Sequence, residues 1–196
     1  ANLLSSILDK GVSQLIKRGV RNDYKPIIEQ TSSPIGKINI TDNFSDHLEK
    51  FKHTLEIAEI LDAKNLRMFS FFIPKEKSAD LYTEEVFERI GKFTEIAKDY
   101  NITLCHENEK GIYGDITERC LELAEYFGDR MGCIFDPSNY IQCGSETLEG
   151  FRLLFVFACR HVVIKRYKSV YNSSRINDIV YELCLDVFLQ IVCCVS

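Results

Sequence analysis

The sequence has few of the residues that interrupt helices and strands. Among its 196 residues there is no tryptophan and there are four prolines, and residues 151–196 contain neither glycine nor proline. That last segment is also apolar, and two interpretations of it stay open. It could form a long helical hairpin, or it could be a stretch not selected to follow the preceding fold, such as a frame-shifted or spliced tail.

Long hydrophobic runs and basic clusters are missing as well. The longest apolar stretch, residues 183–195, is too short to cross a bilayer and carries Asp186. Residues 1–8 lack a charged segment ahead of their apolar residues, so we expect no signal peptide. The net charge of −5 and the absence of an arginine stripe argue against nucleic acid and acidic membranes as partners. We therefore expect a cytoplasmic chain.

No pair of its eight cysteines has C-x-x-C spacing. An even number of cysteines would allow disulfides, but four of them fall inside expected strands or helices. Free and mostly buried thiols in a reducing compartment are the favoured interpretation.

The residues that are present divide the chain into three parts. We expect an N-terminal helical segment over residues 1–31, an α/β domain over residues 32–154 and an apolar, helical tail over residues 155–196. Within the first part, LIKRGVRNDYKPIIEQ faintly resembles the McrC-type subunit of modified-cytosine restriction systems. An amphipathic surface helix would explain the same pattern.

The middle part alternates between helical and extended patterns. Helices are expected over residues 46–63, 80–100 and 115–127, and strands over residues 66–73, 102–105 and 132–135. The third helix has capping-box spacing between Asp115 and Glu118. This alternation predicts a parallel sheet with helices, and it leaves open whether the sheet is a barrel or an open doubly wound sheet. At 196 residues the chain is short for a complete barrel, which takes about 250 residues.

Acidic residues stand at the ends of two successive expected strands. Glu107 follows the strand at residues 102–105, and Asp136 follows the strand at residues 132–135. Because neighbouring parallel strands end at the same rim, the two carboxylates could share one divalent cation. Their hard oxygens suit manganese or magnesium. The alternative is that each acidic residue only caps the helix that follows it.

Four segments carry a resemblance to a known family. They read SSPIGKINITDNF, HLEKFKHTLEIAEILDAKNLRMFSFFIP, LCHENEKGIYGDITERC and IFDPSNYIQCG. Together they resemble bacterial sugar phosphate isomerases/epimerases of the xylose isomerase-like TIM-barrel type, over roughly residues 32–154. HENEKGIYGD and FDPSN are the specific parts. The resemblance implies a partial (β/α)8 barrel, with SPIGKI near the end of the second strand and the three expected strands as the third, fourth and fifth.

The resemblance also implies a site and a chemistry. The superfamily holds one divalent metal with a Glu, an Asp, a His and a second Glu, in that order. Glu107 and Asp136 match the first two, and Glu107 would also move a proton. Asn139 would contact the substrate. His106 and Lys110, on the loop that carries Glu107, could also contact it, but structural roles would explain both residues equally well, and strand alternation points His106 away from Glu107. The implied activity is isomerisation or epimerisation of a sugar or sugar phosphate through an enediolate, in carbohydrate metabolism.

The chain departs from the family beyond residue 154. The family's sixth strand carries the metal-binding histidine, followed by Lys-Asp, whereas this chain has His161 in HVVIKRY. The later glutamate, Glu182, lies in an apolar helical pattern. Strands one, six, seven and eight have no convincing counterpart, so we expect weak metal binding and little activity. Exposed sheet edges would allow a homo-oligomer.

A non-enzymatic function is therefore the alternative. The half-barrel could serve as a packing or dimerisation unit. A third histidine or carboxylate at the rim would favour the enzyme, and a salt bridge from Glu107 to Lys110 or Arg67 would favour the alternative.

Overall fold

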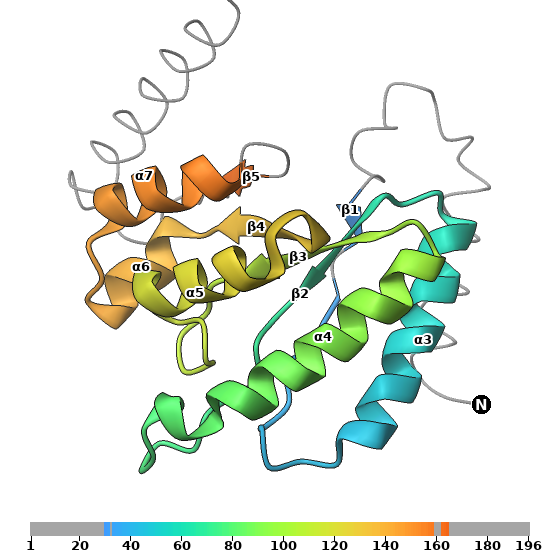
Figure 1. Ribbon diagram of the computed structural model, residues 1–196, viewed down its shortest axis with the longest axis horizontal. Coiled ribbons are helices and arrows are strands. Elements are labelled where there is room, and N and C mark those ends of the chain that lie inside the picture. Colours follow the sequence, from blue (N-terminus) through green and yellow to red (C-terminus); the bar gives the residue numbers. More distant parts are fainter. Residues whose placement is uncertain (1–29, 32, 159–161, 165–196) are drawn as a thin grey trace, which may run out of the picture.

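A five-stranded parallel sheet organises the chain in the computed structural model, which describes residues 30–31, 33–158 and 162–164 (Figure 1). The strands are β1 (Gln30–Thr31), β2 (Asn65–Met68), β3 (Thr103–Glu107), β4 (Met131–Phe135) and β5 (Val162–Ile164). They pair in chain order, all parallel. A doubly wound sheet reverses its strand order at a switch point, whereas a barrel adds strands sequentially. The described sheet therefore has the topology of part of a barrel.

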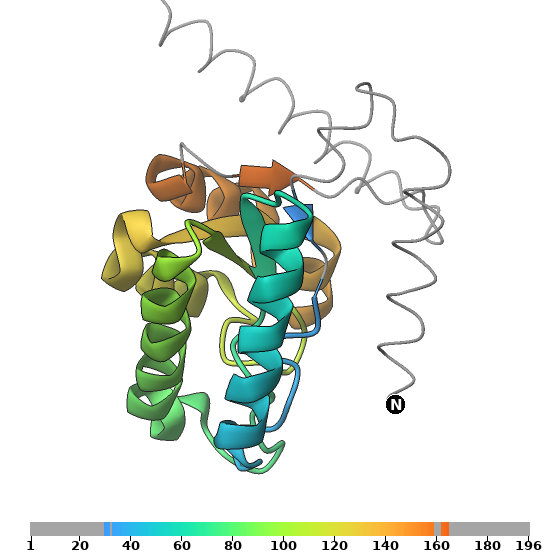
Figure 2. The same ribbon diagram turned by 90° about the vertical axis from the view of Figure 1, so that its right-hand side faces the viewer.

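Helices connect the strands. They are α3 (Phe44–Ile60), α4 (Thr83–Asp99), α5 (Thr117–Phe127), α6 (Pro137–Cys143) and α7 (Thr147–Ala158), with short 3-10 turns η2 (Ala79–Tyr82) and η3 (Gly128–Arg130). Figures 1 and 2 both show α3 and α4 side by side along the sheet. The side chain of Asn43 caps α3 by accepting a hydrogen bond from the Ser45 amide at 3.0 Å.

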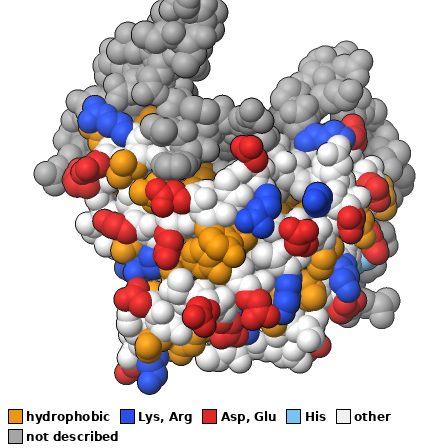
Figure 3. Space-filling model, viewed as in Figure 1, with side chains coloured by type: hydrophobic (Ala, Val, Ile, Leu, Met, Phe, Trp, Pro, Cys, Tyr) orange, Lys and Arg blue, Asp and Glu red, His pale blue; other side chains and the backbone are white. Residues whose placement is uncertain are grey.

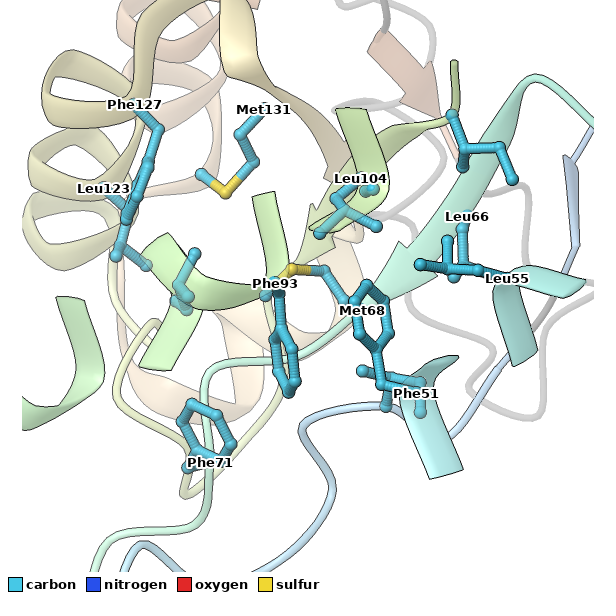
Figure 4. Packing of buried hydrophobic residues seen from close by; sticks show 14 of the residues in the cluster. Phe51, Leu55, Leu66, Met68, Phe71, Phe93, Leu104, Leu123, Phe127 and Met131 are labelled. Atoms are coloured by element: carbon cyan, nitrogen blue, oxygen red, sulfur yellow. The ribbon is translucent and has the colours of Figure 1, made fainter. Parts of the chain in front are cut away.

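The main core lies between the sheet and helices α3, α4 and α5 (Figure 4). Phe51 and Leu55 of α3 and Phe93 of α4 are fully buried, and so are Leu66 of β2 and Leu104 of β3. A smaller cluster joins β4 to α5, α6 and α7; its buried members are Cys120, Ala124, Cys133, Phe135, Tyr140, Phe151 and Leu154. Each large apolar side chain buried in this way stabilises the fold by about 1.5–3 kcal/mol.

The first expected strand is shorter than residues 66–73. Strand β2 ends at Met68, and Phe71 then takes a left-handed backbone conformation with φ of 66°. Gly36 packs against this irregular stretch with φ of 82°, and a Cβ there would lie 1.8 Å from the Phe69 carbonyl oxygen. Only glycine fits that contact. The SPIGKI segment therefore runs directly beside the end of β2.

The other expected boundaries need smaller corrections. The strand expected at residues 102–105 is β3, which extends through Glu107. The expected capping box is wrong, because α5 begins at Thr117 without a side-chain cap and Asp115 instead pairs with Arg119. Helix α6, which the sequence analysis did not predict, begins directly after Asp136.

The expected break after residue 154 does not coincide with a structural boundary. Helix α7 continues to Ala158, and β5 pairs with β4 in register, Val163 opposite Ile134. The sixth barrel strand thus has a counterpart, contrary to expectation. Most of the expected N-terminal helical segment and of the McrC-like segment lies outside the described residues, as do most of the tail, His161 and Glu182. The last two residues of the expected helical segment, Gln30 and Thr31, form strand β1 instead.

The four cysteines of the described part are free thiols, as expected. Burial raises the pKa of Cys105 to about 12 and that of Cys133 to about 11, so both stay protonated at neutral pH. Within the described ranges, no helix combines the length and the apolarity needed to cross a membrane. Figure 3 shows acidic and basic side chains interspersed over the face in view.

Candidate active site at the carboxyl ends of the strands

The strand register decides which side chains share the face opposite the main core. Arg67 of β2 pairs with Cys105 of β3, and Glu107 of β3 pairs with Ile134 of β4. Paired residues of parallel strands face the same side, and alternate residues along a strand share a face. Arg67 and Glu107 therefore lie on one face. Asp136, two residues beyond Ile134, continues that face at the rim, which supports the expected arrangement of the two carboxylates.

Glu107 is a buried carboxylate with a cationic partner. Its side chain is 2% exposed, and its Oε2 accepts a hydrogen bond from Nη1 of Arg67 at 3.0 Å. A charge removed from water in this way needs such a partner, because an uncompensated buried charge is strongly destabilising. This ion pair is the contact that the sequence analysis associated with the non-enzymatic alternative.

Asp136 performs the capping role that was the alternative to metal binding. Its Oδ1 accepts hydrogen bonds from the backbone amides of Ser138 at 3.0 Å and Asn139 at 3.3 Å, and Pro137 opens helix α6. These contacts satisfy two amides at the helix N-terminus. Capping through one oxygen is compatible with a second role, because a carboxylate can accept several hydrogen bonds or metal contacts through its two oxygens.

Asn108, which the sequence analysis did not assign, joins the two carboxylate-bearing loops. Its Nδ2 donates to the Asp136 carbonyl at 2.9 Å, and its Oδ1 accepts from the Asp136 amide at 2.8 Å. Asn139 completes the contact by donating from Nδ2 to the Asn108 carbonyl at 2.8 Å. All of these groups are buried, so the rim is held by satisfied polar contacts. A polar residue directly after a strand end was the signal available in the sequence.

The remaining expected site residues are placed differently. His106 is buried on the core side of β3, where its Nε2 lies 3.0 Å from Oγ of Ser70. Burial lowers the pKa of His106 to about 4. The structure thus separates His106 from Glu107, as alternation indicated. Lys110 is exposed on the loop after β3, and its substrate contact stays a prediction.

A second ion pair lies beside the first and was not foreseen. Lys37, from the SPIGKI segment, binds Glu109 with an Nζ–Oε2 distance of 2.7 Å. The Lys37 ammonium lies 4.2 Å and the Arg67 guanidinium carbon 5.2 Å from the centre of the Phe69 ring. Two cation–carboxylate pairs therefore flank one aromatic ring at this end of the sheet.

The donor set can be compared with the needs of a divalent cation. Glu107 and Asp136 supply hard oxygens from neighbouring strands on one face, which fits manganese or magnesium in kind and in placement. The register position on β5 opposite Ile134 holds Val163, a residue type without a metal-binding atom. In the part of the chain that the structure describes, no three His, Cys, Asp or Glu side chains group around one point. Among the described residues, Glu107 and Asp136 are thus two candidate ligands.

Solved structures share this architecture. A D-tagatose 3-epimerase-like protein matches with a TM-score of 0.62 at 19% identity, over 81% of this chain and 66% of its own. The 3-keto-D-glucoside 4-epimerase from E. coli matches with a TM-score of 0.61 at 12% identity, over 80% and 66%. A xylose isomerase-like TIM barrel protein from Mycobacterium smegmatis in complex with magnesium matches with a TM-score of 0.54 at 13% identity, over 66% and 48%.

These likenesses establish the fold. The described residues have the fold of part of a TIM barrel, and the chain spans two thirds or less of the solved structures it matches. No protein-family model matches the sequence, and no curated protein matches it either.

Proposed function

We propose that the described barrel segment belongs to a divalent-metal-dependent sugar or sugar phosphate isomerase/epimerase, and that this chain alone turns over little or no substrate. The observation that carries the proposal is the placement of Glu107 and Asp136 on one face, at the carboxyl ends of neighbouring strands. In barrels of this kind, the active site lies at that end of the strands.

Each rim residue has a role in the proposal. Glu107 moves the proton at the carbon beside the sugar carbonyl, and the substrate passes through an enediolate. Glu107 and Asp136 hold manganese or magnesium, which when bound supplies positive charge at the substrate oxygens. Asn139 contacts the substrate through its amide oxygen, since its Nδ2 donates to Asn108. Asn108 holds Asp136 and Asn139 in position.

The limits on turnover follow from the same contacts. Two protein ligands leave most of a cation's coordination sphere to water, so binding is weak and unselective. Arg67 already occupies one carboxylate oxygen of Glu107 through the ion pair. A further acid/base group to return the proton would come from outside the described residues.

A second candidate is a non-enzymatic half-barrel that packs against another chain. The Arg67–Glu107 ion pair favours it, because a buried pair of this kind can be purely structural. The enzyme candidate requires that the rim binds a sugar and that this binding depends on the carboxylates of Glu107 and Asp136. The packing candidate requires no sugar binding.

Sugar binding separates the two candidates without requiring turnover. Relaxation of the protons of a ketose or ketose phosphate by protein-bound Mn²⁺ would be measured by NMR for the wild type, Glu107→Gln and Asp136→Asn. Glu125→Gln, an exposed change on α5, is the matched control. We expect relaxation enhancement in the wild type and in Glu125→Gln, and its loss in both rim variants. A folded wild-type chain with no enhancement would support the packing function instead.

A further inference from the structure

We infer that Arg67 is a built-in competitor of the divalent cation, holding Glu107 in a metal-free state until its guanidinium is displaced. The inference rests on the proposed function and assigns Arg67 a regulatory role at the same site. It starts from the position of Arg67 on β2, paired with Cys105, on the same face as Glu107. The contact is direct, with Nη1 of Arg67 3.0 Å from Oε2 of Glu107.

The surroundings of Arg67 hold it in place for this contact. Its own carbonyl accepts a hydrogen bond of 2.6 Å from Oγ of Ser33, which fixes the backbone at this point of β2. The guanidinium stacks over Phe69 at 5.2 Å. Arginine stays charged at all accessible pH values. A guanidinium thus places a positive charge beside the Glu107 carboxylate.

The Nε atom of Arg67 differs from Nη1, which binds Glu107. Its Nε is buried and makes no hydrogen bond within the structure. A buried donor without a partner costs free energy, so the observed guanidinium position is not the best one available to an unconstrained side chain. The side chain as a whole is 21% exposed, against 2% for Glu107. Arg67 is therefore the more solvent-accessible partner of the ion pair.

Binding of a divalent ion to Glu107 is unfavourable while the Arg67 guanidinium is still in contact with it. A divalent ion bound to Glu107 at the oxygen-ligand distance of about 2.0–2.6 Å would sit within a few ångströms of the guanidinium. Like charges at that separation repel strongly where water is excluded. Metal binding must therefore move Arg67 out, and removal of the guanidinium must favour the metal.

The test uses Mn²⁺ alone, with free ion followed by electron paramagnetic resonance. We expect Arg67→Met to bind Mn²⁺ more tightly than the wild type by roughly tenfold or more, with Arg67→Lys in between. Adding Glu107→Gln to Arg67→Met should cancel the gain. Arg152→Met, at an exposed position on α7, is the control and should leave the affinity unchanged. An Arg67→Met chain that stays folded and binds Mn²⁺ no better than the wild type would overturn the inference.

A second measurement needs no variant that might misfold. In the wild type, the Arg67 Nε–H resonance would be followed by NMR during titration with Mg²⁺. Displacement predicts a changed chemical shift and faster exchange with solvent, and an unchanged resonance at saturating Mg²⁺ would contradict the inference. No sugar is present in either experiment. Failure of sugar binding would count against the proposed function, whereas these results bear on Arg67 only.

Discussion

The two faces of the sheet are built on different principles. On the helix side, aromatic and aliphatic side chains of α3, α4 and α5 meet those of β2 and β3, and most are fully buried. On the opposite face and at the rim, charged residues take over, with Arg67 beside Glu107 and Lys37 beside Glu109. The first face is closed by packing, whereas the second depends on ion pairs and amide contacts.

This difference indicates where stability and chemistry reside. Apolar burial is the dominant favourable contribution to folding, so we expect the helix side to supply most of the stability. Buried charges add little net stability and are retained where a position or a reaction needs them. Changes on the helix side should therefore act on folding, and changes at the rim should act on ligand binding.

The largest effect on stability should come from the centre of the helix side. Phe93 of α4 is fully buried, with ring centroids 4.5 Å from Phe51 and 5.4 Å from Phe44. Phe93→Ala should lower the free energy of unfolding by about 3–5 kcal/mol, measured by urea denaturation. Ile60→Ala, at a residue 78% exposed on α3, is the matched control and should change it by less than about 0.5 kcal/mol. Equal effects would mean that Phe93 is not buried in the core as described.

A smaller effect should appear as pH falls. Burial lowers the pKa of His106 to about 4, and burial followed by the charges of Lys50 and Arg89 lowers that of His47 to about 4. The unfolded chain takes up protons near pH 6.5 and the folded chain does so only near pH 4. The free energy of unfolding therefore falls as pH drops through this window, and it levels off below it.

His106→Gln tests this prediction at one position. The glutamine can still bond to Ser70, but it does not titrate. The variant should lose roughly half of the pH dependence, on the order of 3 kcal/mol between neutral pH and pH 4. The measurement is urea denaturation at a series of pH values, and an unaltered slope would mean that His106 is not buried as described.

Much of the fold was predictable because its periodicity is strong. The expected helices and strands of the middle part all occur. Glu107 ends one strand and Asp136 follows another, and both strands were visible as short apolar runs. The end of β2 was not predictable, because the apolar run continues past Met68 while Phe71 adopts φ of 66°. That conformation depends on the tertiary contact with Gly36, which no local pattern encodes.

The site was less accessible to sequence reasoning than the fold. The pairing of Arg67 with Glu107 joins residues 40 positions apart, so its geometry requires the strand register. The amide contacts of Asn108 with Asp136 have the same origin. Strand β5 was missed because HVVIKRY lacks the expected Lys-Asp, although its short β-branched run fits a strand.

The most direct test of the account measures the exchange of solvent protons into a substrate. It asks whether the rim lacks a complete catalytic site although the helix side is fully packed. The folded chain would be incubated in deuterated buffer with Mn²⁺ and a ketose or ketose phosphate, and the metal would be removed before NMR acquisition. We predict little or no exchange above background, and no measurable difference between the wild type and Glu107→Gln. Robust exchange that Glu107→Gln abolishes would contradict the account, because the rim would then hold a complete catalytic site.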